Sequence, residues 1–576
     1  MVNVKINNVS YSVPDGSTIL EAARLAGIDI PTLCFMKKLN EIGACRICVV
    51  EVKGARSLVT ACVYPVNEGM EIFTNTSTIQ KARKTTLELM LSTHERKCLS
   101  CVRSQDCELQ KLCKEYGVED EDKFDGSKPV YNITKGTVIT RDNNKCILCR
   151  RCVAACQNQS VGILGANNRG FDTYIGCAFD RDIGDDNCIG CGQCIVACPT
   201  GALTETDATE KVWDALADTS KTVIVHTAPS VRATLGECFG MPVGTNVEGK
   251  MAAALRRLGF NQVFDTDVAA DLTILEEANE LIHRVQNGGV LPMITSCSPG
   301  WIKYCEHFHE DMIPNLSTCK SPQQMMGAVI KTYYAEKMGL DPKDMYVVSV
   351  MPCTAKKFEI TRDDQAAAGV PDNDAVLTTR ELARMIQRAG LDFVNLPDEE
   401  FDAPLGIATG AAAIFGATGG VMEAALRTAV KAITGSEAPA PEFKDVRGTE
   451  QIKEAEYDLN GLKIKVAVTS GTQGAKKLME KVKNGESEYT FIEVMGCPGG
   501  CVNGGGQPLQ PPHVRNFTDL KALRAKALYD QDAADVLRNS HDSPVVKELY
   551  DNYFGEPNSH KAHHTLHTSY VARGRK

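Results

Sequence analysis

The stretch Cys146-Ile-Leu-Cys149-Arg-Arg-Cys152-Val-Ala-Ala-Cys156 is repeated in pattern as Cys188-Ile-Gly-Cys191-Gly-Gln-Cys194-Ile-Val-Ala-Cys198-Pro199. In each stretch two residues separate the first three cysteines from one another, and three residues precede the fourth. Three thiolates this close can wrap one corner of an iron-sulfur cubane, and the fourth, displaced thiolate reaches a neighbouring cluster. The two stretches therefore predict a pair of [4Fe-4S] clusters with crossed ligation.

Crossed ligation divides the eight cysteines into two sets of four. One set is Cys146, Cys149, Cys152 and Cys198, and the other is Cys156, Cys188, Cys191 and Cys194. A structural zinc site is the alternative, although zinc motifs space their ligands in pairs rather than in two such triplets. We expect residues 126–209 to form a domain of the bacterial ferredoxin type that holds both clusters.

The composition of the chain agrees with a metal-rich protein. There are 24 cysteines among 576 residues, whereas the charged (24%) and apolar (43%) fractions are those of ordinary globular proteins. Most of the cysteines precede residue 200, and no apolar secretory core occurs among the first residues, so we expect a cytoplasmic protein with reduced thiols. The net charge of -10 argues against nucleic acid as a partner, because affinity for nucleic acid comes mainly from Lys and Arg.

One long uncharged stretch, residues 403–422, equals a membrane span in length. It contains five glycines, one proline and two threonines, which is a poor composition for a spanning helix. We expect buried backbone that lines a site, and no membrane span.

A further group of cysteines, Cys34-x10-Cys45-x2-Cys48-x13-Cys62, lies within residues 1–78. Four thiols close a [2Fe-2S] site, although the spacing departs from that of plant ferredoxins. Zinc and unligated core thiols are the alternatives.

The same residues carry the local signals of a small α+β domain. Residues 3–13 alternate apolar and polar around Asn7-Asn8, as in a hairpin whose turn tolerates positive φ. Thr18 and Glu21 fit a capping box for a helix that Gly27 ends. We expect a domain of the plant-ferredoxin (β-grasp) type.

Residues 79–125 contain the spacing His94-x3-Cys98-x2-Cys101-x5-Cys107. Three thiols need a fourth ligand, and imidazole can replace thiolate on iron. His94 is the expected ligand of this third [4Fe-4S] cluster, with Cys113 as its competitor. Five cysteines have no partner at ligand spacing and are expected to be buried free thiols: Cys113, Cys177, Cys238, Cys305 and Cys319.

The acidic run of residues 119–122, followed by Gly126, Ser127 and Pro129, is expected to be a solvated connection between N-terminal domains. After residue 210 the sequence pattern becomes that of an α/β domain. The expected strands are residues 222–225, 290–295, 346–350, 463–469 and 489–495. Cys297, Cys353 and Cys497 each follow one of them closely, and functional groups of open α/β sheets gather at the carboxyl ends of strands. We therefore expect the three thiols on one sheet edge.

Three stretches of residues 210–576 carry a family resemblance: Thr295-Ser-Cys-Ser-Pro-Gly-Trp301, Met351-Pro-Cys-Thr-Ala-Lys-Lys-Phe-Glu359 and Glu493-Val-Met-Gly-Cys-Pro-Gly-Gly-Cys-Val-Asn-Gly-Gly-Gly-Gln507. They resemble the three signatures of [FeFe]-hydrogenases, and the order of N-terminal clusters resembles the clostridial type. The resemblance implies an H-cluster, in which a [4Fe-4S] cubane is bridged to a diiron unit carrying CO, CN and azadithiolate. It also implies the reaction 2H+ + 2e- ⇌ H2, maturation enzymes, and ferredoxin or a flavoprotein or iron-sulfur subunit as redox partner.

The resemblance assigns roles at the cluster. Cys353, Cys497 and Cys501 match the family's ligands, with Cys501 at the bridging position, and Lys356 matches the lysine that donates to a cyanide. We also expect the bare backbone of Gly504 to Gly506 to approach the inorganic group. The matching wall residues of the diiron pocket are Ala228, Pro229, Ser230, Gln323, Met351, Phe415 and Met495.

Cys297-Ser298 departs from the commonest pattern, which has two adjacent cysteines. The gapless match makes Cys297 the thiol that passes protons and places Ser298 at the fourth ligand position of the cubane. The alternative is that Cys297 ligates the cubane and the proton relay is altered, since iron-sulfur clusters prefer thiolate.

A proton route is also implied. Leu272 to Val285 has the apolar stripe of a helix, on which Glu277 and Glu280 are i,i+3 neighbours. Two helical glutamates usually form a solvated face. The resemblance overturns that expectation, because Cys297, Glu277, Ser317 and Glu280 match the family's pathway in order.

Two other functions compete with a stand-alone hydrogenase. One is the catalytic subunit of a multimeric NAD(P)-linked or electron-bifurcating hydrogenase, which would need a flavoprotein subunit because this chain has no dinucleotide fingerprint. The other is a non-catalytic sensor or iron-sulfur carrier, which would have no use for Cys297, Lys356 and Glu277. His563, His564 and His567 have a spacing that can bind zinc, but ordinary histidines of a docked tail are expected.

Overall fold

Two units make up the structure, which is a computed structural model of the chain. The first contains Met1–Asp186, Gln193–Thr204 and Gln510–Thr518, and the second contains Asn187–Gly192, Glu205–Leu509 and Asp519–Lys576. The structure describes residues 1–119, 123–126, 130–184, 186–438, 440–486 and 488–575. Most of the predicted acidic connection lies outside these ranges.

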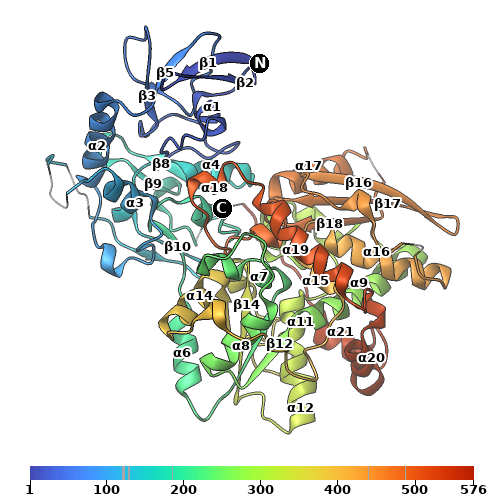
Figure 1. The fold of residues 1–576 in the computed structure, drawn as a ribbon. Coiled ribbons are helices and arrows are strands. Elements are labelled where there is room, and N and C mark those ends of the chain that lie inside the picture. Colours follow the sequence, from blue (N-terminus) through green and yellow to red (C-terminus); the bar gives the residue numbers. More distant parts are fainter. Residues whose placement is uncertain (120–122, 127–129, 185, 439, 487, 576) are drawn as a thin grey trace. The chain divides into compact units, whose positions relative to one another are not determined.

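The N-terminal residues form a five-stranded sheet of order β2-β1-β5-β3-β4 (Figure 1). The predicted hairpin is confirmed, because β1 (Val2–Ile6) and β2 (Val9–Val13) pair antiparallel around Asn7 and Asn8, whose φ angles are 49° and 69°. The predicted capping box of Thr18 and Glu21 begins α1 (Ile19–Leu25), and Gly27 follows its end with a φ of 74°. The other strands are β3 (Val49–Val52), β4 (Val59–Thr60) and β5 (Glu71–Phe73).

The rest of the first unit consists of short elements around the remaining cysteines of the N-terminal third. Its helices are α2 (Ser77–Leu91), α3 (Glu108–Glu115), α4 (Arg151–Asn158), α5 (Gln193–Ala197) and α18 (Pro512–Arg515). A three-stranded sheet joins β6 (Thr134–Lys135), β7 (Ile139–Arg141) and β10 (Leu203–Glu205), and β8 (Gly165–Asn167) pairs with β9 (Tyr174–Gly176). α4 carries Cys152 and Cys156, whereas α5 carries Cys194 and ends just before Cys198.

The segment Gln510–Thr518 belongs to the first unit, although its place in the chain lies inside the predicted domain of residues 210–576. Arg515 Nη1 donates to Glu108 Oε1 at 2.9 Å, and Asn516 Oδ1 accepts from the backbone N–H of Lys37 at 3.2 Å. Contacts between positions so far apart in sequence have no local signature, so the sequence pattern assigns this segment elsewhere.

The second unit contains two four-stranded sheets (Figure 1). The first is entirely parallel and has the order β12-β11-β14-β15, from β11 (Thr222–Thr227), β12 (Gln262–Asp265), β14 (Met345–Met351) and β15 (Ala375–Thr378). The second has the order β13-β18-β17-β16, from β13 (Met293–Ile294), β16 (Ile452–Leu459), β17 (Leu462–Ser470) and β18 (Phe491–Met495). Helices cover both sheets, as the α/β pattern predicts.

Four of the five expected strands are present with small changes at their ends, but residues 290–295 form only the two-residue β13. Pro292 lacks the N–H that a central strand needs, and Val290 and Leu291 are exposed. The expectation of one sheet edge for three thiols is also wrong. Cys353 follows β14 in the parallel sheet, whereas Cys297 and Cys497 follow β13 and β18 in the mixed sheet.

Two long helices of the second unit carry segments singled out in the sequence. α9 (Asp267–Gln286) carries the two glutamates of the predicted proton route, and α16 (Gly420–Thr434) begins within the glycine-rich residues 403–422, which are largely buried as expected. None of the helices in the described ranges combines the length and apolarity that crossing a membrane requires. The other helices of the unit are α6 (Thr209–Ala217), α7 (Pro229–Arg232), α8 (Glu248–Leu258), α10 (Pro299–Phe308), α11 (Pro322–Val329), α12 (Ala335–Met338), α13 (Lys356–Glu359), α14 (Thr379–Arg388), α15 (Gly410–Ala413), α17 (Thr472–Lys483), α19 (Leu520–Ala534), α20 (Pro544–Leu549) and α21 (His560–Leu566).

Candidate active site and iron-sulfur sites

A cavity of about 70 Å³ lies where strands of both sheets of the second unit end. All seven wall residues expected from the resemblance line it: Ala228, Pro229, Ser230, Gln323, Met351, Phe415 and Met495. Cys297, Ser298, Cys353, Lys356 and Cys501 also line it. The structure thus brings together residues from four of the strand ends and from the loop before α16.

The thiols in this cavity suit an iron-sulfur group. Burial raises the pKa of Cys353, and it raises the pKa of Cys501 to about 12. Thiols that stay neutral in an apolar cavity ionise when a metal binds them, and soft sulfur donors prefer iron-sulfur clusters. Cys497 is buried but is not among the residues that line the cavity.

Ser298 faces the loop that carries Cys497. Its Oγ accepts a hydrogen bond from the backbone N–H of Gly496 at 3.0 Å, although Ser298 stands at the N-cap of α10, where a hydroxyl usually accepts from its own helix. A hydroxyl turned away from its helix and toward Cys497 is compatible with the predicted ligand position.

The glycines after Cys501 have a different use from the expected one. A Cβ at Gly504 would lie 2.3 Å from the carbonyl oxygen of Pro352, and one at Gly505 would lie 2.3 Å from that of Cys191. A Cβ at Gly506 would meet Thr378 at 2.8 Å. The glycines therefore allow protein atoms, rather than an inorganic group, to pack closely against this loop. As a result, the loop that follows Cys501 packs against the loop of Cys353.

Lys356 is held at the cavity by three acceptors. Its Nζ donates to the carbonyl oxygen of Cys297 at 3.2 Å, to Ser321 Oγ at 2.7 Å and to Glu359 Oε2 at 2.9 Å. The side chain is mostly buried, so this is not a solvated surface lysine. The ammonium is fixed beside Cys297, where it can donate to an anionic group in the cavity.

The sequence analysis missed Glu359, which orients two cavity residues. Its Oε2 accepts from Lys356, from Ser321 Oγ at 2.9 Å and from Gln323 Nε2 at 2.9 Å. Glu359 stands three positions after Lys356 in the second signature, and this i,i+3 spacing with an opposite charge is the signal that identifies it.

The predicted proton route contains two glutamates in different environments. Glu277 is buried, and neither of its carboxyl oxygens has a hydrogen-bond partner among the described residues. Burial, with the nearby charge of Glu280, raises the pKa of Glu277 to about 8. A carboxyl group that is mostly protonated at neutral pH can both give and take a proton.

Glu280 is linked to Ser317 and to solvent. Ser317 Oγ donates to Glu280 Oε2 at 2.9 Å, and Arg284 forms an ion pair with Glu280 Oε1 at 2.6 Å. Arg284 was not among the expected residues, although it follows Glu280 by four positions on the same helix and so shares its face. Both side chains are partly exposed, so this pair forms the outer end of the predicted route.

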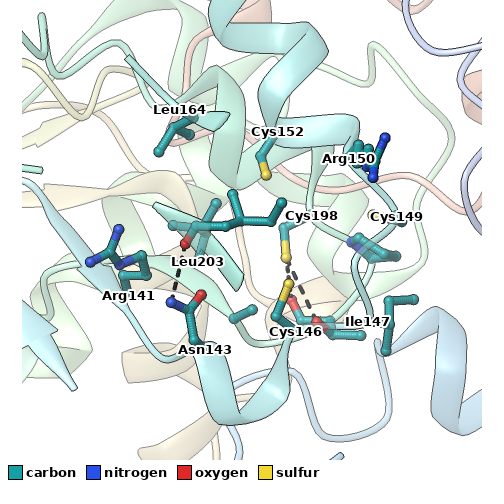
Figure 2. Close-up of a pocket in the computed structure, with 14 residues that line it drawn as sticks. Arg141, Asn143, Cys146, Ile147, Cys149, Arg150, Cys152, Leu164, Cys198 and Leu203 are labelled. Carbon is teal, nitrogen blue, oxygen red and sulfur yellow. Dashed lines mark hydrogen bonds between the residues drawn. The ribbon is translucent and has the colours of Figure 1, made fainter. Parts of the chain in front are cut away.

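In the first unit, the set Cys146, Cys149, Cys152 and Cys198 lines one pocket, to which the two repeated stretches both contribute. Figure 2 shows Cys146, Cys152 and Cys198 directed into the same space. Burial raises the pKa of Cys146 to about 12 and of Cys149 to about 11. The pocket has the donors that the predicted crossed ligation requires.

The other set is divided between the units, with Cys156 and Cys194 in the first and Cys188 and Cys191 in the second. This set stays a prediction. Within the second unit, Thr354 Oγ1 donates to the carbonyl oxygen of Gly190 at 2.7 Å, which fixes the loop of Cys191 beside the loop of Cys353.

The four cysteines of residues 1–78 form two close pairs. Cys34 and Cys45 exchange backbone N–H to sulfur contacts of 3.4 Å, and the sulfurs of Cys48 and Cys62 lie 3.3 Å apart. The neighbouring thiol and burial raise the pKa of Cys34, and the same causes raise that of Cys62. All four lie near one another without being in disulfides, as a four-thiolate metal site requires.

Asn40 connects this group with the next site. Its Nδ2 donates to the carbonyl oxygen of Cys34 at 2.7 Å and to that of Cys149 at 3.2 Å, and Asn40 itself is buried. The two predicted clusters are therefore joined through one side chain.

His94 is buried and its Nδ1 has no hydrogen-bond partner among the described residues. Burial lowers the pKa of His94 to about 4, so the imidazole is neutral and has a lone pair for a metal. The competitor Cys113 packs in an apolar cluster with Leu109 and Leu112 of α3, but so does the predicted ligand Cys107. The unpartnered, neutral imidazole is therefore what favours His94 as the fourth ligand.

The cysteines near His94 also approach the pocket of Cys198. Cys107 Sγ lies 3.7 Å from the carbonyl oxygen of Pro199, and a Cβ at Gly201 would lie 2.7 Å from Cys101 Sγ. The cysteine group that contains Cys34 and the group that contains Cys101 therefore both lie close to the pocket of Cys149 and Cys198.

Comparisons with known proteins agree with these sites. Residues 221–505 match the family described as iron only hydrogenase large subunit, C-terminal domain, and residues 518–573 match iron hydrogenase small subunit. Residues 1–77 match a 2Fe-2S iron-sulfur cluster binding domain, residues 83–122 the NADH-ubiquinone oxidoreductase-G iron-sulfur binding region, and residues 145–202 a 4Fe-4S dicluster domain.

Two curated proteins are similar over nearly their whole length. The NADP-reducing hydrogenase subunit HndD of Solidesulfovibrio fructosivorans is 47% identical, with 100% of both chains covered. Iron hydrogenase 1 of Clostridium pasteurianum is 45% identical, with 99% of this chain and 100% of the relative covered. Among solved structures, a variant of the [FeFe]-hydrogenase HydA1 from Chlamydomonas reinhardtii is 42% identical and superimposes with a TM-score of 0.57, covering 63% of this chain and 99% of that one.

Proposed function

The chain belongs to the [FeFe]-hydrogenase family, and we propose that its cavity holds the H-cluster at which protons and H2 interconvert, 2H+ + 2e- ⇌ H2. The observation that carries the proposal is the convergence of Cys297, Cys353, Lys356 and Cys501 in one cavity whose other walls are mostly apolar. An iron-sulfur carrier needs ligands, but it does not need a fixed ammonium and a spare thiol facing the same space.

Cys353, Cys497 and Cys501 would hold the cubane, with Ser298 as the fourth ligand. When bound, the H-cluster supplies the metal centre at which the bond of H2 forms or breaks. We propose that its diiron unit carries CO, CN and azadithiolate and lies among the wall residues. Lys356, held by Glu359, donates a hydrogen bond to an anionic ligand, and the apolar walls exclude water.

Protons reach the cavity along side chains of the protein. Glu280 exchanges protons with solvent, Ser317 passes them inward, and the protonated carboxyl of Glu277 delivers them to the thiol of Cys297. The 2.9 Å bond of Ser317 to Glu280 and the raised pKa of Glu277 support this order. Since neither carboxyl oxygen of Glu277 has a hydrogen-bond partner among the described residues, its proton is available for transfer.

Electrons reach the cavity along iron-sulfur clusters, for which we propose one [2Fe-2S] and three [4Fe-4S]. The [2Fe-2S] site of Cys34 and the site of His94 are two entry points, because each approaches the central pocket of Cys149 and Cys198 separately. From there the cluster of Cys191 leads to the cubane.

An infrared spectrum of the protein matured with its assembly enzymes tests the proposal, together with H2 evolution from a reduced low-potential dye. We expect CO and CN stretching bands and turnover. Cys501→Ala should lose both while the optical signals of the accessory clusters remain. Bands absent from fully iron-loaded protein would leave only a carrier or sensor.

A multimeric NADP-linked enzyme is the second candidate, and the 47% identity to an NADP-reducing hydrogenase subunit over both whole chains favours it. The partner would then be a flavoprotein subunit in place of ferredoxin. Purification of the chain from a cytoplasmic extract, followed by assays with NADP and with ferredoxin, distinguishes the two. NADP reduction that depends on a co-purifying flavoprotein supports the multimeric enzyme.

A further inference from the structure

Glu280, Cys319 and His567 form a group of three different donors at the outer end of the proton route. Glu280 comes from α9, Cys319 from the segment before α11, and His567 from the end of α21. One donor atom of each lies within 4.8 Å of the others, and Cys319 Sγ lies 3.8 Å from Glu280 Oε2. Neither Cys319 nor His567 has a part in the mechanism proposed above.

The spacing and the donors suit zinc. A tetrahedral zinc ion with Zn–S near 2.3 Å and Zn–O near 2.0 Å holds sulfur and oxygen about 3.5 Å apart, so the 3.8 Å separation needs little movement. Thiolate, imidazole and carboxylate are the ligands that proteins use for this ion. Calcium and magnesium prefer sites made of oxygen alone and fit this group less well.

The His567 imidazole is held at both ring nitrogens. Nε2 donates to the carboxylate oxygen Glu276 Oε2 at 3.0 Å, and Nδ1 accepts from Thr318 Oγ1 at 2.8 Å. A metal that binds Nε2 shifts this proton to Nδ1. A histidine ligand commonly donates its second ring N–H to a neighbouring oxygen, which here is the hydroxyl of Thr318. Nε2 can then bind the metal, with Glu276 Oε2 or a water as the fourth ligand.

The charges around the group favour a cation. Glu276 and Glu280 both supply carboxylate oxygens, and Glu277 lies nearby on the same helix. Among the groups facing Glu280, Arg284 is cationic, but it binds Oε1. Oε2 accepts from Ser317 Oγ at 2.9 Å and from the backbone N–H of Thr318 at 3.1 Å, and it lies 3.8 Å from Cys319 Sγ. His563 is exposed and stacks on His567 with ring centroids 4.5 Å apart, which gives an entering cation a first ligand at the surface.

We propose that Glu280, Cys319 and His567 form an inhibitory zinc site that closes the proton route. The ion replaces the thiol proton of Cys319, which leaves as H+, and it occupies the carboxylate of Glu280. A carboxylate bound to a dication neither accepts a proton from solvent nor passes one to Ser317. The inhibition rests on the proposed proton route, whereas zinc binding does not.

Zinc titration of the matured holoenzyme tests the site, with zinc K-edge absorption as the binding measurement because it is blind to iron. We expect one zinc with a single sulfur neighbour near 2.3 Å and the rest nitrogen or oxygen. H2 evolution should fall as this zinc binds and recover on chelation, with the iron content unchanged. Two or more sulfur neighbours, or iron released in proportion to zinc, would mean attack on the clusters and overturn the proposal.

Two variants and a control locate the ion. Cys319→Ser and His567→Gln should each retain activity without zinc and raise the half-inhibiting zinc concentration about tenfold or more. Cys305→Ser removes another buried free thiol, whose sulfur contacts the carbonyl of His309, and should leave inhibition unchanged. Equal zinc inhibition in all variants would refute the site. Zinc that binds through Cys319 without loss of turnover would refute the closing of the proton route. The turnover of Glu277→Gln, measured without zinc, tests the proton route by itself.

Discussion

The thiol sulfur of Cys497 lies 3.9 Å from the carbonyl oxygen of Cys191. Each cysteine is a predicted ligand of a different cluster, so in the proposed arrangement a single backbone group separates a ligand of the last accessory cluster from a ligand of the cubane. Gly505 makes this approach possible, because any Cβ there would lie 2.3 Å from the same carbonyl oxygen. The proposed electron route into the cavity would therefore depend on the packing of two loops that are distant in sequence.

Replacing His94 with alanine should alter the magnetic resonance signal and potential of one accessory cluster and leave the others unchanged. The reason is that His94, whose Nδ1 has no partner among the described residues, is the proposed fourth ligand of the site of Cys98, Cys101 and Cys107. Redox titration followed by electron paramagnetic resonance measures the change. Cys113→Ser is the matched control and should have no effect. The opposite result for the two variants would make Cys113 the ligand.

Cys297→Ala should retain the cubane and lower turnover by about 10²-fold or more, because it removes a proton-transfer group. Ser298→Ala should instead reduce the iron bound at the cubane. Iron analysis and electron paramagnetic resonance of the two variants, before the diiron unit is inserted, separate the roles. Loss of the cubane from Cys297→Ala would show that the thiol, and not the serine, is the fourth ligand.

Glu277→Gln should lower H2 turnover in both directions by about 10²- to 10⁴-fold, the usual worth of a proton-transfer group. Every cluster signal should remain, since the side chain touches no predicted ligand position. Glu276→Gln is the control on the neighbouring position, where the carboxylate accepts from Tyr550 OH at 2.6 Å and lies outside the route. A Glu277→Gln enzyme that evolves H2 at the wild-type rate would exclude this route.

The same carboxyl should make stability depend on pH. The pKa of Glu277 is raised from 4.5 to about 8, so between these values the folded protein keeps a proton that the unfolded chain releases. The contribution of Glu277 to the free energy of unfolding is therefore intact below pH 4.5. As the pH rises from 4.5 to 8, this contribution falls by about 1.4 kcal/mol for each pH unit. The melting temperature of the wild type, relative to Glu277→Gln, should fall over this range. A constant difference between the two proteins would contradict the raised pKa.

Glu108→Gln should destabilise the first unit by roughly 3–5 kcal/mol, because it leaves buried guanidinium groups without a counter-charge. Both oxygens of Glu108 accept from the fully buried Arg151 at 2.9 Å, and Arg515 adds a third bond. Burial alone would raise the pKa of Glu108, but these two arginines outweigh it and lower the pKa to about 2.

Calorimetry of the iron-loaded chain measures the loss. The control on the same helix is Glu115→Gln, whose ion pair with Lys111 is half exposed and 3.8 Å long, and it should cost less than ~0.5 kcal/mol. Similar melting temperatures for Glu108→Gln and Glu115→Gln would show that the buried carboxylate of Glu108 does not stabilise the first unit.

Local sequence determined the local structure. The Asn7-Asn8 hairpin, the Thr18 capping box and the helix carrying Glu277 depend on residues within a few positions of one another, so the sequence alone predicts them. The spacing of the cysteines likewise fixes which thiols are close enough to share a cluster, because a short loop limits how far they can separate.

Tertiary packing decided the rest. The two sheets that meet at the cavity, the Asn40 bridge between Cys34 and Cys149, and the return of Arg515 to Glu108 join segments that share no sequence pattern. The glycines after Cys501 illustrate the reason: the sequence shows that the backbone there is bare, but only the folded chain shows that the atoms it admits are Pro352 and Cys191. A sequence motif identifies the functional groups, because its residues lie close together in the chain. The place of those groups in the fold results from the close packing of segments that are distant in sequence, and no local pattern encodes that packing.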